Sequence, residues 1–253
     1  MSILVRLIGF PATLLHGDLL VLDRWRWLTK SLQKIDATRQ SRVLDVGCGT
    51  GAFTIGAARR GYQTLGLSWD DRNQRVAAER AIMCNAPGAS FEVCDVRNLE
   101  ARGDLSNSFD YIICTENIEH IIDDQKLVKE MSRCLKKGGK LLLTTPNFDF
   151  IPMYGESKLI TDPPVEDGGH VRIGYTKADL QRLCEIAGLS VQQISFCSGF
   201  FSQKLTSLLR FFNQADYRLG WVLILPFRLL PVLFDKLIPY TGYSICLVAE
   251  KKT

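Results

Sequence analysis

The chain has 253 residues, of which 46% are hydrophobic and 23% are charged, and its formal net charge is +4. This length and hydrophobic content are typical of one large α/β domain with additions, or of one domain with a small cap. The mild charge and the absence of a long basic run argue against nucleic acid as a partner.

Eight cysteines are scattered along the sequence, and none of them forms a CxxC pair. This spacing argues against a disulfide or zinc framework and predicts reduced, mostly buried thiols in a cytoplasmic protein. The apolar stretch 1–10 is interrupted by Arg6 and followed by Pro11, so we do not expect a signal peptide. Leucines and tryptophans at helical spacing in residues 1–40 predict a cap of one or two helices, over the core or over the substrate. His16, in this region, has no evident partner and is expected to be structural.

The stretch 42–58 predicts a cofactor site. Arg42 to Val46 has the composition of a short buried strand, three glycines follow at alternate positions, and small apolar residues then begin a helix. Such a turn lets a ligand approach the backbone, and the helix N-terminus offers unpaired N–H donors. Asp45, within the strand, can receive an ammonium group, whereas a pyrophosphate has no use for a negative charge. The glycines and the alanine after them also satisfy the dinucleotide fingerprint, so an NAD-dependent oxidoreductase is a weaker alternative.

Further apolar stretches alternate with helical patterns, which predicts a doubly wound α/β sheet. We expect strands at 42–46, 63–67, 90–94, 109–114, 140–145, 191–197 and 243–250, and helices at 52–58, 71–84, 123–135 and 176–187. Thr176 is the expected N-cap of the last helix, with Asp179 in the capping-box position. The loop 148–170 is rich in proline and glycine, and loops of this length are commonly functional or mobile.

Two motifs carry a family resemblance. The DVGCGTG string at 45–51 resembles motif I of the class I S-adenosylmethionine (SAM)-dependent methyltransferases, and the LKKGG string at 135–139 is similar to their LKPGG turn. The resemblance covers residues 40–197 and 243–250 and implies a seven-stranded, mostly parallel, Rossmann-like sheet with an antiparallel last strand. It also implies cofactor contacts at ten positions, namely Asp45, Gly47, Cys48, Gly49, Ser68, Trp69, Asp70, Asp95, Val96 and Thr115.

The sequence departs from this family after the second expected strand. Ser68 occupies the position of the acid that binds the ribose hydroxyls, so Asp70 or Asp71 is the expected substitute and Trp69 is expected to stack against the adenine. Alternatively, the two aspartates only begin the next helix, where carboxylates favour the positive end of the dipole. Asp95 matches the acid that accepts a hydrogen bond from the adenine amino group, and a surface turn is the alternative role for it.

An ExxEH sequence follows the fourth expected strand, at the sheet edge where ligands bind in doubly wound folds. If this segment is helical, Glu116 faces the same side as Glu119 and His120. His170 closes the long loop and is expected to fold back over the same edge. Two carboxylates and two imidazoles suit an octahedral Mg²⁺ or Mn²⁺ site, and without a metal His120 or His170 is the expected general base.

The same ExxEH sequence is similar to those of the ubiquinone-biosynthesis O-methyltransferases and the small-RNA 2′-O-methyltransferases. This resemblance implies Glu116, Glu119, His120 and His170 as metal ligands, with Glu116 and both histidines in catalytic roles. It also implies methyl transfer to a hydroxyl of a hydrophobic or lipid-linked small molecule.

Two other functions stay open. Gly66-Leu67-Ser68, Asn73-Gln74 and Glu119-His120 resemble the cyclopropane fatty-acid synthases, so lipid C-methylation is an alternative chemistry. A non-catalytic SAM-binding subunit is the other alternative.

Residues 198–242, between the last two expected strands, form an insertion beyond the common loop length. Its uncharged apolar run is too short to span a bilayer of ~30 Å, but basic residues recur among its leucines and aromatics, which suits a membrane interface. A hydrophobic cap over the substrate or a homodimer face fits equally well, because two prolines prevent one continuous amphipathic helix. We therefore expect a helical cap (1–40), a SAM-binding core (41–197 and 243–253) and this insertion.

Overall fold

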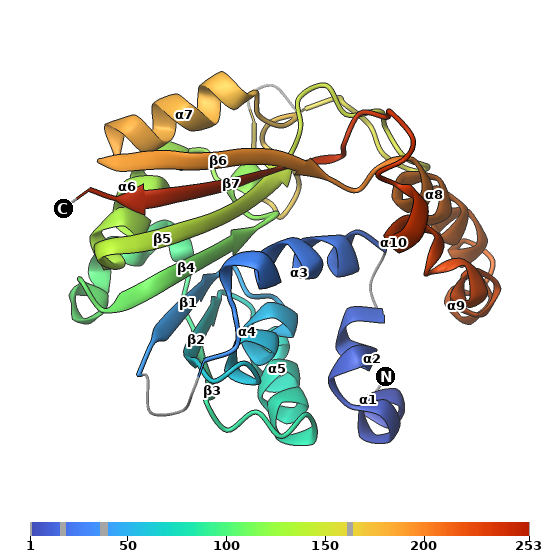
Figure 1. The fold of residues 1–253 in the computed structure, drawn as a ribbon, viewed down its shortest axis with the longest axis horizontal. Coiled ribbons are helices and arrows are strands. Elements are labelled where there is room, and N and C mark those ends of the chain that lie inside the picture. Colours follow the sequence, from blue (N-terminus) through green and yellow to red (C-terminus); the bar gives the residue numbers. More distant parts are fainter. Residues whose placement is uncertain (1, 16–18, 36–39, 161–163, 253) are drawn as a thin grey trace.

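The computed structural model describes residues 2–15, 19–35, 40–160 and 164–252, so His16 lies outside the described residues. One sheet contains the seven strands β1 (Arg42–Val46), β2 (Gln63–Ser68), β3 (Ala89–Val93), β4 (Phe109–Thr115), β5 (Leu135–Pro146), β6 (Leu189–Cys197) and β7 (Ser244–Lys251). Their order is β3-β2-β1-β4-β5-β7-β6, and β7 is antiparallel to both of its neighbours (Figure 1). The expected mostly parallel sheet with an antiparallel last strand is confirmed.

Helices cover both faces of the sheet (Figure 1). On one face lie α1 (Ser2–Ile8), α2 (Phe10–Leu15), α3 (Leu19–Ser31), α4 (Ala52–Ala58) and α5 (Asp71–Met83), and on the other α6 (Asp124–Cys134) and α7 (Lys177–Ile186). Short 3₁₀ turns follow β3 and β4, namely η1 (Val96–Ala101), η2 (Gly103–Leu105) and η3 (Ile118–His120). In the described part of the chain, three helices precede β1, rather than the one or two expected.

Local sequence sets the ends of these elements. The capping box at α7 is confirmed, since Thr176 and Asp179 each accept a hydrogen bond from the other residue's backbone amide. The expected fifth strand is longer than predicted, because it begins at Leu135 rather than at Lys140. Phe109 pairs with Leu135 before the register shifts, and Gly138, at φ +71°, accommodates the irregularity. The LKKGG turn is therefore part of the strand.

The middle of the sheet is buried on both faces, which is why its strands are continuous apolar runs. In β4, Ile112 packs into the cluster that includes Met131 of α6, and the next residue, Ile113, packs into the cluster with Trp25 and Leu28 of α3. All five side chains are less than 9% exposed. Packing on both faces holds β4 in place. The residues that follow β4 are therefore attached to a rigid strand.

The insertion forms α8 (Phe200–Asn213), α9 (Tyr217–Ile224), η4 (Leu225–Phe227) and α10 (Leu230–Phe234), beyond the carboxyl ends of the parallel strands (Figure 1). Pro226 and Pro231 each lie in the first turn of a new helix, which divides the segment as expected. Ser202 Oγ joins α8 to α3 and to the end of α10, at 2.5 Å from Asp23 Oδ2 and 2.7 Å from Asp235 Oδ2. A hydroxyl has one proton, so it can donate to only one of these two carboxylates at a time, and burial raises the pKa of Asp23.

Candidate functional site

The glycine loop after β1 holds a buried carboxylate with one unused oxygen. Asp45 is 1% exposed, and its Oδ2 accepts a hydrogen bond of 2.6 Å from Thr54 Oγ1 in α4. Its Oδ1 has no partner among the described residues. Burial raises the pKa of Asp45 to about 6. A buried acceptor without a donor fits the ammonium group of SAM, reached directly or through one water.

Glycine is required where the loop turns. Gly47 and Gly49 have φ values of +82° and +51°. A Cβ on Gly47 would lie 2.4 Å from the side chain of Asn117, whereas a Cβ on Gly49 would meet nothing within 4 Å. Asn117 therefore covers the first glycine, and the second leaves the backbone open to a ligand. No sequence motif marks Asn117, because only the packing of the segment after β4 brings it to this loop.

Of the residues at the end of β2 and just after it, one caps the next helix and another is exposed on the surface. Ser68 is buried, and Asp70 caps α5 by accepting hydrogen bonds from the amides of Arg72 and Asn73. This contact agrees with the alternative that Asp70 begins the helix, although its second oxygen is not used by the cap. Trp69 is 69% exposed, so its ring faces are accessible to a stacking partner. The cofactor roles of these three residues remain predictions.

Asp95 lies at the end of β3, as predicted, but it is engaged by an arginine. Arg97 donates to both carboxylate oxygens, with Nε at 2.9 Å and Nη2 at 2.6 Å. These bonds lower the pKa of Asp95. The side chain of Val96 is buried in the main core, which leaves its backbone for any contact with a ligand. Asp95 and Arg97 line a depression of about 450 Å³.

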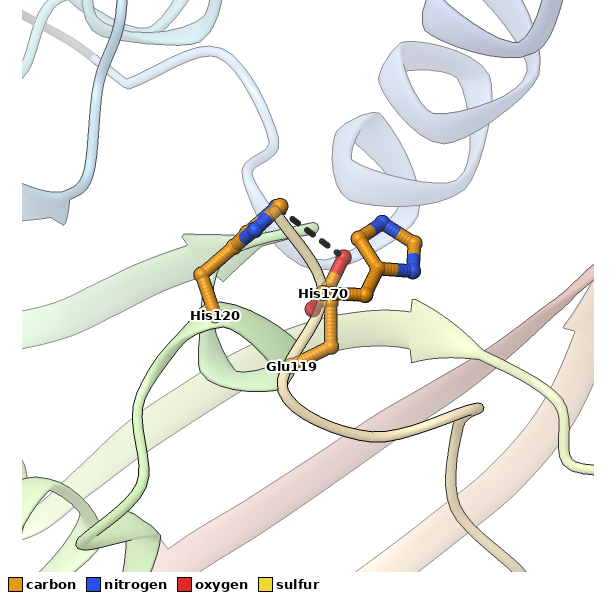
Figure 2. Close-up of side chains that lie close together, drawn as sticks. All are labelled: Glu119, His120 and His170. Carbon is orange, nitrogen blue, oxygen red and sulfur yellow. Dashed lines mark ion pairs between the residues drawn. The ribbon is translucent and has the colours of Figure 1, made fainter. Parts of the chain in front are cut away.

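Glu119, His120 and His170 come together at the carboxyl end of β4 (Figure 2). Their ligand atoms all lie within 4.8 Å of one another. Glu119 is fully buried; its Oε2 accepts from Thr145 Oγ1 at 3.1 Å, and its Oε1 has no hydrogen-bond partner among the described residues. Burial, and then the carboxylate of Glu116, raise the pKa of Glu119. The structure thus brings together three of the four side chains predicted to hold a metal.

The orientation of His120 is set by the opposite loop. His120 Nδ1 lies 2.9 Å from the carbonyl oxygen of Gly169. A carbonyl can only accept, so we assign the proton to Nδ1 and a free lone pair to Nε2. Nε2 is 4.0 Å from Glu119 Oε1, and the His170 ring is 4.8 Å from the His120 ring. Burial and the neighbouring His120 lower the pKa of His170. His120 can act as a base or as a ligand.

The predicted position of Glu116 is wrong. The helical turn begins only at Ile118, and Glu116 itself has φ +46°, so it does not share a helix side with Glu119 and His120. Its carboxylate instead lies 3.0 Å from Arg24 of α3 and accepts from Thr144 and Ser244, each at 3.0 Å. Among the described residues, Glu116 is outside the group of ligand atoms. Its observed contacts attach α3 to the segment from Glu116 to His120 after β4, which is called the catalytic edge below.

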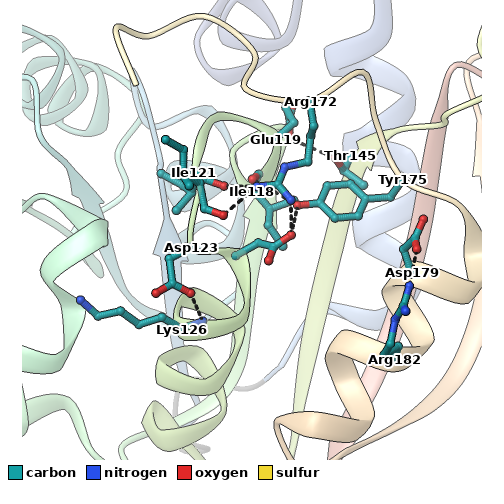
Figure 3. Close-up of polar contacts among 12 residues, drawn as sticks. Ile118, Glu119, Ile121, Asp123, Lys126, Thr145, Arg172, Tyr175, Asp179 and Arg182 are labelled. Atoms are coloured by element: carbon teal, nitrogen blue, oxygen red, sulfur yellow. Dashed lines mark hydrogen bonds and ion pairs between the residues drawn. The ribbon is translucent and has the colours of Figure 1, made fainter. Parts of the chain in front are cut away.

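The loop that carries His170 is clamped by Arg172 (Figure 3). Arg172 donates to the carbonyls of Ile121 and Ile122, at 2.6 and 2.9 Å, and pairs with Asp124, which also accepts from Tyr175 at 2.8 Å. No local signal in the sequence predicted this clamp, because its partners lie about 50 residues away along the chain.

The comparisons with known proteins show the family to which the chain belongs. A methyltransferase domain model matches residues 23–194. The chain is 27% identical, over 174 residues, to a ubiquinone biosynthesis O-methyltransferase of Leptothrix cholodnii, a match that covers 67% of this chain and 71% of that protein. For two further proteins of that description the match covers 66% and 41% of their length.

Solved structures show the same fold. A SAM-dependent methyltransferase from Aquifex aeolicus has a TM-score of 0.56 at 12% identity, with 90% of each chain covered. Phosphoethanolamine N-methyltransferase 2 of Haemonchus contortus, in complex with SAM, has a TM-score of 0.61 at 19% identity, with 97% of this chain and 57% of that one covered. Since the family model spans more than half of the sequence, the chain belongs to the methyltransferase domain family and is a class I SAM-dependent methyltransferase.

Proposed function

We propose that the protein transfers the methyl group of SAM to a hydroxyl of a hydrophobic or lipid-linked small molecule. The observation that carries this proposal is the contact between His120 Nδ1 and the Gly169 carbonyl, which leaves Nε2 as a proton acceptor. A hydroxyl is a poor nucleophile until its proton is removed, whereas a neutral amine attacks through its own lone pair. A site built around a basic imidazole therefore favours oxygen as the acceptor atom.

In the proposed step, the hydroxyl proton moves to His120 Nε2 as the oxygen attacks the methyl carbon. The oxygen–carbon bond forms while the carbon–sulfur bond of SAM breaks, which gives the methyl ether and S-adenosylhomocysteine (SAH). Glu119, whose Oε1 lies 4.0 Å from Nε2, stabilises the imidazolium that results. Asp45 and the glycine loop hold the methionine part of the cofactor.

A divalent cation is the second part of the proposal. Glu119, His120 and His170 offer one buried carboxylate and two imidazoles, and the unused Glu119 Oε1 fits a cation. Mg²⁺ or Mn²⁺ held there would supply a Lewis acid that lowers the pKa of the acceptor hydroxyl. His120 would then be a ligand rather than the base, so the two mechanisms differ in a measurable way.

Calorimetric titration of Mn²⁺ into SAH-saturated protein separates these mechanisms. We expect about one ion per chain for the wild type, and affinity lower by at least about tenfold in His170→Ala, because one of three protein ligands is lost. SAH affinity, measured in the same samples, should be unchanged in the variant. If the wild type binds no Mn²⁺ and turnover is insensitive to chelators, the metal proposal is wrong and His120 remains as the base.

The surface beside the site supports a hydrophobic acceptor. The insertion exposes large apolar side chains on the side of the molecule where the parallel strands end (Figure 1). Those at least 40% exposed within α8–α10 and the turn after it are Leu208, Phe211, Leu219, Val222, Leu223, Leu225, Phe227, Leu229, Leu233, Phe234 and Leu237. No helix in the described ranges is long and apolar enough to cross a membrane. We propose that this surface lies in a membrane interface and receives a lipid-linked acceptor.

Co-sedimentation with lipid vesicles tests the membrane contact. We expect the wild type to sediment with phosphatidylcholine–phosphatidylglycerol vesicles and the double variant Leu229→Glu, Leu233→Glu to remain in the supernatant. These leucines are 65% and 61% exposed, so the changes should leave the fold intact. Leu159→Glu, at an 89% exposed position outside the insertion, is the matched control. A wild type that never sediments but forms dimers through these leucines would favour the homodimer alternative.

A further inference from the structure

The segment 164–172 is named the strap. It contacts two parts of the site, the residues that follow β3 and the residues that follow β4. Near its start, Glu166 Oε2 lies 3.0 Å from Arg97 Nη1, and Glu166 Oε1 accepts a hydrogen bond of 2.6 Å from the Ile122 amide. One carboxylate therefore joins the strap to the end of β3 and to the segment after β4. The Glu166 side chain is 23% exposed and the Arg97 side chain is 41% exposed.

The later part of the strap holds the catalytic edge. The Gly169 carbonyl accepts from His120 Nδ1, and the Val171 amide donates to the carbonyl of Glu119 at 3.0 Å. His170 lies between these two contacts. A shift of the strap therefore changes the tautomer and orientation of His120 together with the position of His170.

At the other end of this chain of contacts, Arg97 binds Glu166 and Asp95 with the same guanidinium. Both oxygens of Asp95 already accept from Arg97 Nε. An adenine amino group that donates to Asp95 must share or displace these contacts, because each oxygen has only two lone pairs. If adenine binds at Asp95, as the family resemblance implies, its binding acts on Arg97, and Arg97 in turn holds the strap through Glu166.

We propose that Glu166 is a positioning residue, which couples binding of the adenosyl part of the cofactor to the orientation of His120 and His170. The proposal rests on the proposed role of His120 as base or ligand. The proposal implies an order of binding. The cofactor binds first and positions the strap, and only then is His120 oriented correctly for the acceptor. Glu166 itself contacts neither the cofactor nor the acceptor in this scheme.

Nitrogen-15 NMR of the histidine rings tests this coupling without turnover. The chain has three histidines, so their ring signals can be assigned with single variants. At fixed pH, we expect wild-type His120 to show the Nδ1–H tautomer and SAH to shift the His120 and His170 signals. In Glu166→Ala, the SAH-induced shift should be lost although SAH still binds by calorimetry. Arg97→Ala should lose the same shift.

Two further variants make the test specific. Glu166→Gln keeps an oxygen for the Ile122 amide but loses the ion pair with Arg97, so it should keep the fold of the strap and still lose the SAH-induced shift. Glu185→Ala, at an exposed glutamate of α7, should respond as the wild type does. A Glu166→Ala protein with the full SAH-induced shift would overturn the proposal. Failure to find a hydroxyl acceptor would contradict the proposed O-methylation but would leave this readout unaffected.

Discussion

Replacing His120 by alanine should lower kcat by about 10²–10⁴-fold, the contribution typical of a general base. The imidazole is the group that the geometry prepares for proton removal, since the Gly169 carbonyl holds Nδ1 and leaves Nε2 free beside Glu119. SAH affinity should change little, because the observed contacts of His120 are with Gly169, Glu119 and His170 rather than with the methionine-binding loop. Radiolabelled methyl transfer to a panel of catechols and long-chain alcohols measures kcat, and calorimetry measures SAH binding.

The comparison with His170→Gln sharpens this prediction. If His120 is the base and no metal is needed, His170→Gln should retain most of the activity, because glutamine can still contact the neighbouring ring. If a metal is needed, both variants should be inactive at low Mn²⁺, and excess Mn²⁺ should rescue His170→Gln more than His120→Ala. An His120→Ala enzyme with wild-type kcat would contradict both mechanisms.

The Asp45→Asn substitution should stabilise the protein without ligand and weaken cofactor binding. The pKa of Asp45 is raised by burial to about 6, above an ordinary value of about 4. The folded state therefore binds this proton more tightly than the unfolded state. The contribution of Asp45 to the free energy of unfolding is therefore greatest below pH 4 and falls by an amount on the order of 3 kcal/mol as the pH rises through about 6. Asparagine is uncharged and so avoids the cost of burying an ionised carboxylate. The variant should therefore be more stable at pH 7.

The same substitution should lower SAH affinity by about tenfold to 100-fold at pH 7.5, because a charge-assisted hydrogen bond to the ammonium group is lost. For the wild type, affinity should also fall as the pH drops through about 6, where Asp45 takes up a proton, and Asp45→Asn should lack this dependence. Urea unfolding and calorimetry between pH 4 and pH 8 measure both effects. Asp149→Asn, at an exposed position, is the control. A less stable Asp45→Asn protein with wild-type SAH affinity would contradict the role of Asp45.

Much of the fold and the cofactor loop followed from the sequence alone, because both depend on neighbours in the chain. The strand 42–46, the glycine turn and the helix 52–58 have the predicted bounds. The Thr176–Asp179 capping box formed as expected. Backbone preference, apolar periodicity and helix capping act over a few residues, so their pattern is readable without tertiary information.

The catalytic edge was only partly predictable. The sequence indicated that Glu119, His120 and His170 belong together, but it placed Glu116 with them on the assumption of a helical turn. That turn starts two residues later, and the packing of α3 brings Arg24 to Glu116 instead. A partly buried carboxylate pairs with the cation that the tertiary packing places beside it, and sequence spacing does not reveal which cation that is.

Only the tertiary structure decided how the two halves of the site are joined. Glu166 meets Arg97 across 69 positions of sequence, and His120 meets Gly169 across 49. These contacts depend on the path of the strap over the ends of β3 and β4, and side-chain partners at such separations leave no periodic trace in one sequence. The sequence by itself therefore determined the fold class, the cofactor loop and the residue types of the site. The structure determined which of those residues touch, because long-range ion pairs and hydrogen bonds are fixed by packing.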